Sequence, residues 1–195
     1  MPLKDTNTGY GWMSIALHWI TAVVIVVLLF IGNSIATLAG DARTDALRMH
    51  TSIAIVAYVA LLGRIVWRFV YGHPGPLSGQ RGVFFLLGKL THYAILIALA
   101  LMLVSGPLMA WAGYGSIRVF DWVDIPSPFT ASMEFRDLMH AIHRRAAIVI
   151  FIGTLLHLGG VYKHTAFNHD GTLAKIIFPA KPAPAREPGA DTPES

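Results

Sequence analysis

The sequence predicts an all-α fold, a bundle of four transmembrane helices. Of its 195 residues, 54% are hydrophobic and 13% are charged, whereas roughly a quarter of the residues of an average soluble domain are charged. The hydrophobic residues gather in four stretches. Each is long enough for a helix that crosses a bilayer, which needs about 20 residues. The charged residues lie mostly between those stretches. This distribution is typical of a protein that contacts lipid and excludes an ordinary soluble domain.

The four predicted spans cover residues 15–38, 51–70, 83–112 and 141–162. Polar segments connect them: 39–49 is short, 71–81 is rich in Gly and Pro, and 113–140 reads as a longer loop. We expect one membrane domain over residues 1–179 and a disordered tail over 180–195, whose Pro, Ala and charged residues cannot form a core. A cleaved signal peptide is the alternative for the first stretch, but the stretch is long and contains His18, so we expect it to be retained.

An even number of spans places both termini on one side of the membrane. That side carries nine Lys and Arg residues against five acids, and the opposite side carries six against six. The nine are Lys4, Arg64, Arg68, Arg81, Lys89, Lys163, Lys175, Lys181 and Arg186. Because Lys and Arg accumulate on the cytoplasmic side, we expect a multi-pass inner-membrane protein with both termini in the cytoplasm.

Two classes of function are excluded by composition. The net charge of +4 comes from residues that flank apolar segments and form no basic run, which argues against nucleic-acid binding. The sequence has no cysteine, so disulfides, iron–sulfur clusters and thiolate zinc sites are excluded. Any metal or cofactor must therefore be held by other side chains, and the nine histidines are the obvious donors.

Histidines within the predicted spans are candidates for function, because ionisable groups inside a bilayer are costly. His143 and His157 are fourteen residues apart, which is nearly four helical turns, so both lie on one helix face about 21 Å apart. His18 is expected at the depth of His157, and His50 at the depth of His143. The spacing predicts two pairs of histidines, one near each membrane surface.

Two imidazoles that face each other across a bundle suit the two axial positions of a haem iron, whereas a tetrahedral zinc needs more donors. Arg64 lies fourteen residues after His50 and Arg68 one turn further, so both are expected near the cytoplasmic pair, where a guanidinium could neutralise haem propionates. Alternatives remain: intramembrane histidines also form interhelical hydrogen bonds, Arg68 could be only an interfacial anchor, and His140 could replace His143.

The order and spacing of these residues resemble the bacterial cytochrome b561 family over residues 10–179. The resemblance rests on SIALHW at 14–19, on His50 with Arg64 and Arg68, on His92 and Tyr93 with Gly106, on His143 with His157 and His164, and on HDGTLAKIIFP at 169–179. The sequence departs from the family at Ala54, where relatives often carry Gly, and at Pro107, which is displaced. These departures concern local helix packing more than haem ligation.

The resemblance implies an inner-membrane bundle with two haem b groups, the cytoplasmic one held by His18 and His157 and the periplasmic one by His50 and His143. It further implies an oxidoreductase that passes electrons from superoxide to ubiquinone. On the outer side, arginines could attract the superoxide anion, although neighbouring acids could cancel their field. His92, His164 and the cytoplasmic-side arginines are the candidates for a quinone site.

Two other functions fit the same residues. The chain could be a cytochrome b subunit that anchors a hydrogenase or a formate dehydrogenase, which would make a partner redox subunit part of the complex. It could also be a haem-free transporter or proton-relay protein in which the histidines titrate.

Overall fold

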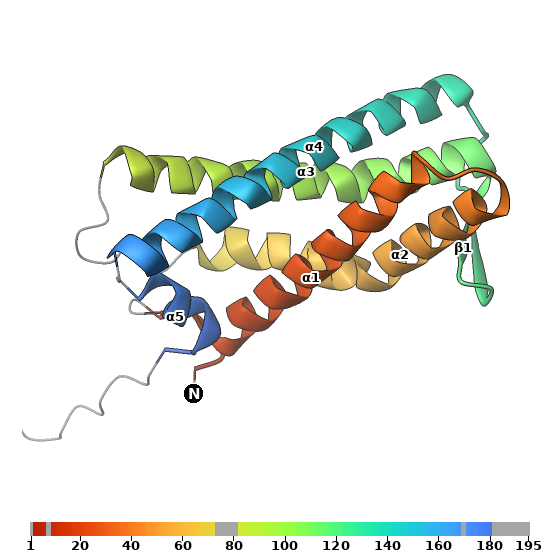
Figure 1. The fold of residues 1–195 in the computed structure, drawn as a ribbon. Coiled ribbons are helices and arrows are strands. Elements are labelled where there is room, and N and C mark those ends of the chain that lie inside the picture. Colours follow the sequence, from red (N-terminus) through yellow and green to blue (C-terminus); the bar gives the residue numbers. More distant parts are fainter. Residues whose placement is uncertain (1, 7–8, 73–81, 169–170, 181–195) are drawn as a thin grey trace, which may run out of the picture.

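Four long helices dominate the computed structural model, which describes residues 2–6, 9–72, 82–168 and 171–180. They are α1 (Trp12–Ile35), α2 (Gly40–Tyr71), α3 (Val83–Tyr114) and α4 (Met133–Lys163), followed by a π-helical turn η1 (His164–Asn168) and a short α5 (Thr172–Ile177) (Figure 1). The four long helices are each long and apolar enough to cross a membrane. The predicted all-α transmembrane bundle is confirmed, and the protein is an integral membrane protein.

Two helices begin well before the apolar stretches that predicted them. Helix α2 starts at Gly40 and α4 at Met133. The extra turns of α2 are stabilised by an ion pair of 2.8 Å between Asp45 and Arg48, three residues apart. Those of α4 follow Ser132, whose Oγ accepts a hydrogen bond from the helix. Hydropathy therefore marks the part of each helix that lipid requires to be apolar, while the helix itself continues into water.

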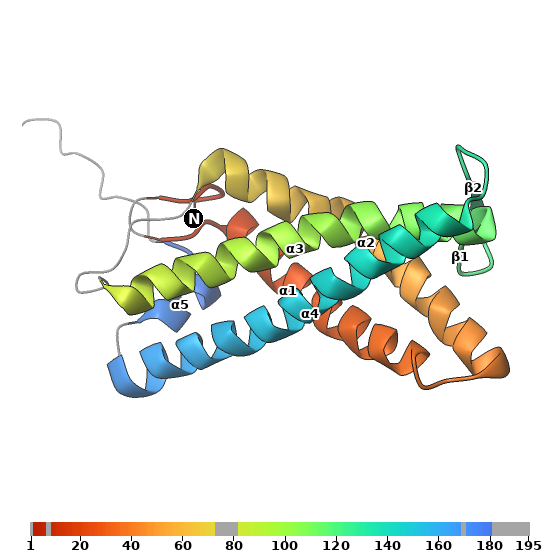
Figure 2. The same ribbon diagram turned by 90° about the horizontal axis from the view of Figure 1, so that it is seen from above.

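The helices pack as two antiparallel pairs, α1 with α2 and α3 with α4, and the pairs cross each other (Figure 2). Backbone contact between the pairs is sparse and runs mainly between α2 and α3. A small core lies at the middle of the bundle: Leu61, Ile65, Ala98, Leu99, Leu103, Ala146 and Ile150. Side chains, and any group bound between them, must therefore fill much of the space between the two helix pairs.

One hydrogen bond between the pairs originates in a helix defect. Pro107 lies inside α3, and because proline has no backbone N–H, the carbonyl four residues earlier loses its helical donor. That carbonyl belongs to Leu103, and the hydroxyl of Tyr58 on α2 donates to it over 3.2 Å. The displaced proline thus creates an acceptor that fastens α2 to α3.

The predicted loop 113–140 is instead partly regular. Strands β1 (Ser116–Val119) and β2 (Val123–Pro126) form an antiparallel hairpin after α3. The backbone N–H of Phe120 donates to Ser52 Oγ on α2 over 2.6 Å, and the Trp111 indole donates to the Ile125 carbonyl over 3.2 Å. The hairpin is therefore tied to two helices, and we call this end of the bundle the hairpin end.

The first and last described segments of the chain meet at the opposite end of the bundle, which we call the terminal end (Figure 1). The carbonyls of Pro2 and Leu3 accept hydrogen bonds from the first turn of α1. After α5, the amide of Ala180 donates to the Tyr10 carbonyl over 2.9 Å. The predicted disorder concerns residues 180–195, of which 181–195 lie outside the described residues.

Candidate functional site

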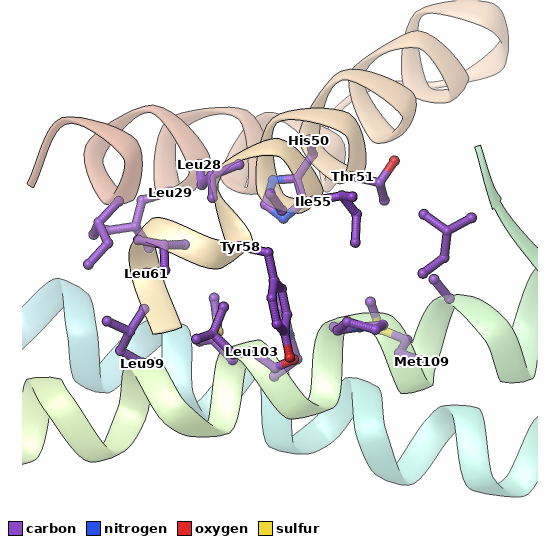
Figure 3. Close-up of a pocket in the computed structure, with 18 of the residues that line it drawn as sticks. Leu28, Leu29, His50, Thr51, Ile55, Tyr58, Leu61, Leu99, Leu103 and Met109 are labelled. Carbon is purple, nitrogen blue, oxygen red and sulfur yellow. The ribbon is translucent and has the colours of Figure 1, made fainter. Parts of the chain in front are cut away.

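Two histidines face each other at the hairpin end. His50 of α2 and His143 of α4 have ring centroids 6.3 Å apart, with an angle of 75° between the ring planes. Both contribute to the wall of an apolar cavity between the helix pairs, into which the ring of His50 points (Figure 3). Ile117 of the hairpin and Tyr58 also line the cavity. The site is thus a pair of imidazoles in an otherwise almost entirely hydrocarbon space.

A glycine lies against each of these imidazoles. A Cβ atom on Gly32 of α1 would be 3.3 Å from Cε1 of His50, and a Cβ on Gly106 of α3 would be 3.3 Å from Cε1 of His143. Any larger side chain would therefore press on the ring. Sequence reasoning found Gly106 but missed Gly32; the signal was available, since Gly32 follows His18 by the same fourteen residues that separate His92 from Gly106.

Ser105 fixes the protonation of His143. Its hydroxyl lies 2.6 Å from the Leu101 carbonyl, to which it can only donate, and 3.1 Å from His143 Nδ1. A hydroxyl has one proton, so Ser105 must accept from Nδ1–H of His143. We therefore assign the tautomer of His143 in which Nε2 carries a free lone pair, the form that binds a metal. Sequence reasoning did not single out Ser105.

At the terminal end, His18 of α1 and His157 of α4 form a similar pair. Their ring centroids are 6.2 Å apart with an interplanar angle of 65°, almost the separation found at the hairpin end. A third imidazole joins this layer: the ring of His92 on α3 lies 4.9 Å from that of His157. His92 is the more exposed residue, whereas His18 and His157 are half-buried.

Two arginines of α2 accompany the terminal-end layer. Arg64 lies close enough to act electrostatically on both His18 and His157, and its buried Nη1 has no hydrogen-bond partner among the described residues. Arg68 is only 6% exposed; it donates to the Gly72 carbonyl and lies over the ring of Tyr10. A buried guanidinium with an unused donor favours an anionic group nearby.

The donor set fits two haem groups better than it fits another metal centre. With metal–nitrogen bonds of about 2.0–2.1 Å on both sides, two axial imidazoles must have ring centres roughly 6 Å apart. The pairs His50–His143 and His18–His157 meet this requirement, and His92–His157 is too close. The described residues contain no cluster of three or more His, Asp or Glu side chains that could hold a metal ion. The apolar walls around His50 and His143 and the unpaired Nη1 of Arg64 also fit a haem with its propionates.

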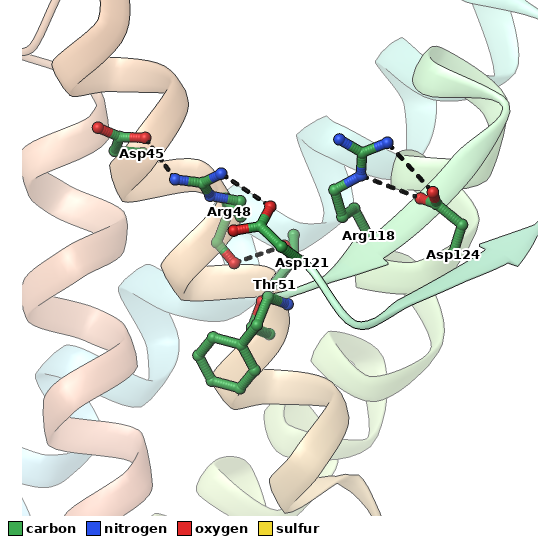
Figure 4. A network of polar contacts seen from close by, with 8 residues as sticks. Asp45, Arg48, Thr51, Arg118, Asp121 and Asp124 are labelled. Atoms are coloured by element: carbon green, nitrogen blue, oxygen red, sulfur yellow. Dashed lines mark hydrogen bonds and ion pairs between the residues drawn. The ribbon is translucent and has the colours of Figure 1, made fainter.

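Other candidates from the sequence lie at the edges of these sites. His164 is the first residue of η1, seven residues beyond His157, and His140 is exposed one turn before His143. Among the basic residues of the hairpin end, Arg48, Arg118 and Arg136 pair with acids, as Figure 4 shows for the first two. The bond to Asp124 raises the pKa of Arg118. His73, His169 and Arg81 lie outside the described residues.

Paired imidazoles in a four-helix membrane bundle define a membrane cytochrome of the b type. The chain belongs to the prokaryotic cytochrome b561 family, which residues 9–179 match. The chain is similar to cytochrome b561 homolog 2 of Escherichia coli (strain K12), with 27% identity over 179 residues, which cover 91% of this chain and 95% of the relative. Family membership implies b-type haem and electron transfer, and it removes the haem-free transporter from consideration.

Proposed function

We propose that this protein carries electrons across the bilayer through two haem b groups, from a donor at the hairpin end to ubiquinone at the terminal end. His50 and His143 would hold the first haem, and His18 and His157 the second. The observation that carries the proposal is the matched geometry of the two pairs, with ring centroids 6.3 and 6.2 Å apart. If the histidines only stabilised helix packing, there would be no reason for two pairs with the same ring separation, one at each end of the bundle.

Each bound haem supplies a one-electron couple between ferric and ferrous iron. The chain would contribute two imidazoles to hold each haem, His50 with His143 and His18 with His157. Ser105 keeps the ring of His143 oriented, and the nearly apolar wall around His50 excludes water. Arg64 would neutralise a propionate at the terminal end.

Charge at the hairpin end supports superoxide as the donor. Arg48, Arg118 and Arg136 are neutralised by acids, but Arg144 and Arg145, which follow His143 directly, are exposed and form no ion pair within the described part of the chain. Two exposed positive charges without an ion pair, beside one of the paired histidines, would raise the encounter rate of a small anion.

The terminal-end layer supports exchange with a quinone. His92 is an exposed residue, and its ring contacts that of His157. An imidazole in that position can hydrogen-bond to a carbonyl oxygen of a quinone that arrives from the bilayer. His164 and Arg68 are the further candidates, since both lie at the same end.

The charge distribution also supports an orientation in the inner membrane. Within the described residues, the terminal end carries Lys4, Lys89, Lys163 and Lys175 in addition to the two arginines of α2, against one acid, Asp5. The hairpin end has equal numbers of basic and acidic residues. By the positive-inside rule, we place the terminal end with both termini in the cytoplasm and the hairpin end in the periplasm.

The experiment that tests the function uses the purified protein alone. We expect about two b-type haems per chain, the number of paired sites, rapid haem reduction by enzymatically generated superoxide, and reoxidation by a soluble ubiquinone. Superoxide dismutase should abolish the reduction phase. Failure of the haems to reduce with superoxide would remove this donor, and failure to reoxidise with quinone would remove this acceptor.

One observation favours a second candidate, a membrane subunit that receives electrons from a soluble redox protein. Trp122 at the tip of the β1–β2 hairpin is 82% exposed, on a hairpin fastened to α2 and α3. Exposed tryptophans on rigid supports are frequent anchors of protein interfaces. Co-purification of a catalytic subunit from native membranes, lost in Trp122→Ala, would establish this function; full superoxide and quinone turnover by the isolated chain would overturn it.

A further inference from the structure

A groove lies on the outer surface of the α3–α4 pair. Its volume is about 300 Å³, and it is lined by Leu90, Thr91, Ala94, Val149, Ile152, Gly153 and Leu156. Six of these seven residues are apolar, and the groove lies within two of the helices that can cross a membrane. Ala94 is an exposed small residue between larger neighbours, whereas Gly153 is buried and lets Ile95 of α3 pack closely against α4 at the floor of the groove. Such a groove on a membrane-facing surface suits a hydrocarbon chain.

The faces that form the groove continue toward the terminal end. On α4, Gly160 and Lys163 follow Leu156 by four and seven residues, so all three share one helix face. On α3, Phe84 precedes Thr91 by seven residues, which also places it on the groove face. A Cβ on Gly160 would have nothing within 4 Å. The surface of α4 is therefore open at Gly160, between the groove and Lys163.

Lys163 closes the groove with a positive charge. Its Nζ lies 4.6 Å from the ring centroid of Phe84, so the cation is held between the two helices at the membrane boundary. The ion pairs within the described residues all lie at the hairpin end, and none involves Lys163. A lysine at a helix end with an apolar groove beside it has the charge pattern of a lipid headgroup site.

We propose that this groove binds an anionic phospholipid, with the phosphate at Lys163 and one acyl chain along Leu156, Gly153 and Ala94. The occupant is a lipid rather than the quinone because the candidate redox groups point elsewhere. His92 and His157 each follow a groove residue by one position, which turns them about 100° from the groove face, and their rings contact each other. A molecule in the groove would thus contact the helix backs and not the haem-binding side.

The test is a titration of the haem-loaded protein in detergent, followed by native mass spectrometry. Phosphatidylglycerol should bind more tightly than phosphatidylcholine. Lys163→Gln should weaken phosphatidylglycerol binding about fivefold, the factor expected for one lysine at an anionic membrane surface, and Ala94→Phe should reduce binding by filling the groove. The matched control is Lys4→Gln, because Lys4, which precedes α1, also lies over an aromatic ring at the terminal end. That ring belongs to Tyr71, the last residue of α2, and not to a helix of the groove.

Several results would overturn the proposal. Equal weakening by Lys163→Gln and Lys4→Gln would indicate a diffuse basic surface. Competition by inorganic phosphate at millimolar concentration would indicate a free-anion site without an acyl chain. Displacement of the lipid by ubiquinone, sensitive to Ala94→Phe but not to Lys163→Gln, would assign the groove to a quinone tail. Haem absorbance reports folding of each variant, and Leu156→Trp replaces Ala94→Phe if that variant loses haem.

Discussion

The two histidine layers are built on the same spacing but from different residues. On every long helix the residue of one layer is fourteen positions from that of the other: His18 with Gly32, His50 with Arg64, His92 with Gly106, and His143 with His157. The hairpin-end layer therefore contains two histidines and two glycines, and the terminal-end layer contains three histidines and an arginine. One scaffold thus provides a tight apolar site and a polar site with donors to spare.

The surroundings of the two layers also differ: the hairpin-end layer is covered and apolar, and the terminal-end layer is more polar. A hairpin tied to α2 and α3 covers the first, and Ile117 lines its cavity. Charges near it are largely paired (Figure 4). At the second layer, Arg64 retains an unused donor and His92 is exposed. In the proposed function, the first site passes electrons and the second also meets a quinone from the bilayer.

The largest expected effect comes from removing one histidine of each pair. His50→Ala should lose the hairpin-end haem and His157→Ala the terminal-end haem, so each variant should retain about one of two haems. Haem quantification with a reduced-minus-oxidised spectrum measures this, and the two spectra should differ because different haems remain. His140→Ala, which changes an exposed histidine beside His143, is the control and should keep both. Retention of both haems in His50→Ala and His157→Ala would refute the ligand assignment.

Replacing a glycine of the hairpin-end layer by a larger residue should affect the haem of that layer alone, although no ligand is changed. Gly32→Leu and Gly106→Leu would each push on an imidazole of the hairpin-end pair, and because a packed interior adapts only partly to added volume, we expect loss of most haem from that site alone. The same haem assay measures the loss. Gly159→Leu on α4, where nothing lies within 4 Å, is the matched control. An equal loss in the control would show that glycine in these helices matters for folding and not for the site.

Ser105→Ala should weaken the hairpin-end site more moderately. The change removes the acceptor of Nδ1–H on His143, and loss of such a partner lowers metal-site affinity by about 10–100-fold. Transfer of haem to an excess of a haem-scavenging protein measures the release rate. Ser34→Ala is the control, because Ser34 donates to the Ile31 carbonyl of its own helix and to no histidine. Equal release rates in both variants would show that Ser105 does not orient the ring.

Hydropathy and spacing were sufficient to predict the bundle and the opposing histidines. Lipid requires apolar residues around every span. The fourteen-residue spacing places His143 and His157 on one helix face. The spans and this common face can therefore both be recognised from short stretches of sequence. Hydropathy could not predict the helix starts at Gly40 and Met133, because a polar segment outside the membrane can form either a helix or a loop.

The hairpin and the Ser105 contact were missed for another reason. Strands of four residues carry a weak alternation signal, and the hairpin depends on acceptors far away in the sequence, such as Ser52 on α2. The contact of Ser105 with His143 joins residues 38 positions apart. Only the packing of α3 on α4 brings that hydroxyl to the imidazole, and no local pattern records it.

The smallest expected effect concerns the charges at the hairpin end. Replacing Arg144 and Arg145 together by Gln should lower the second-order rate of haem reduction by superoxide by roughly two- to tenfold, and it should flatten the dependence of that rate on ionic strength, because steering by exposed charges is screened by salt. Stopped-flow absorbance in buffers of increasing ionic strength measures both quantities.

The control for this charge is Arg118→Gln, in which the lost cation was already neutralised by Asp124. It should leave the rate and its salt dependence nearly unchanged, because a paired charge contributes little field at the distance of an approaching anion. If Arg118→Gln slows reduction as much as the double variant does, the relevant quantity is the total charge of this surface. If neither variant has an effect, Arg144 and Arg145 do not guide superoxide to the haem, and these two arginines contact some other partner at the hairpin end.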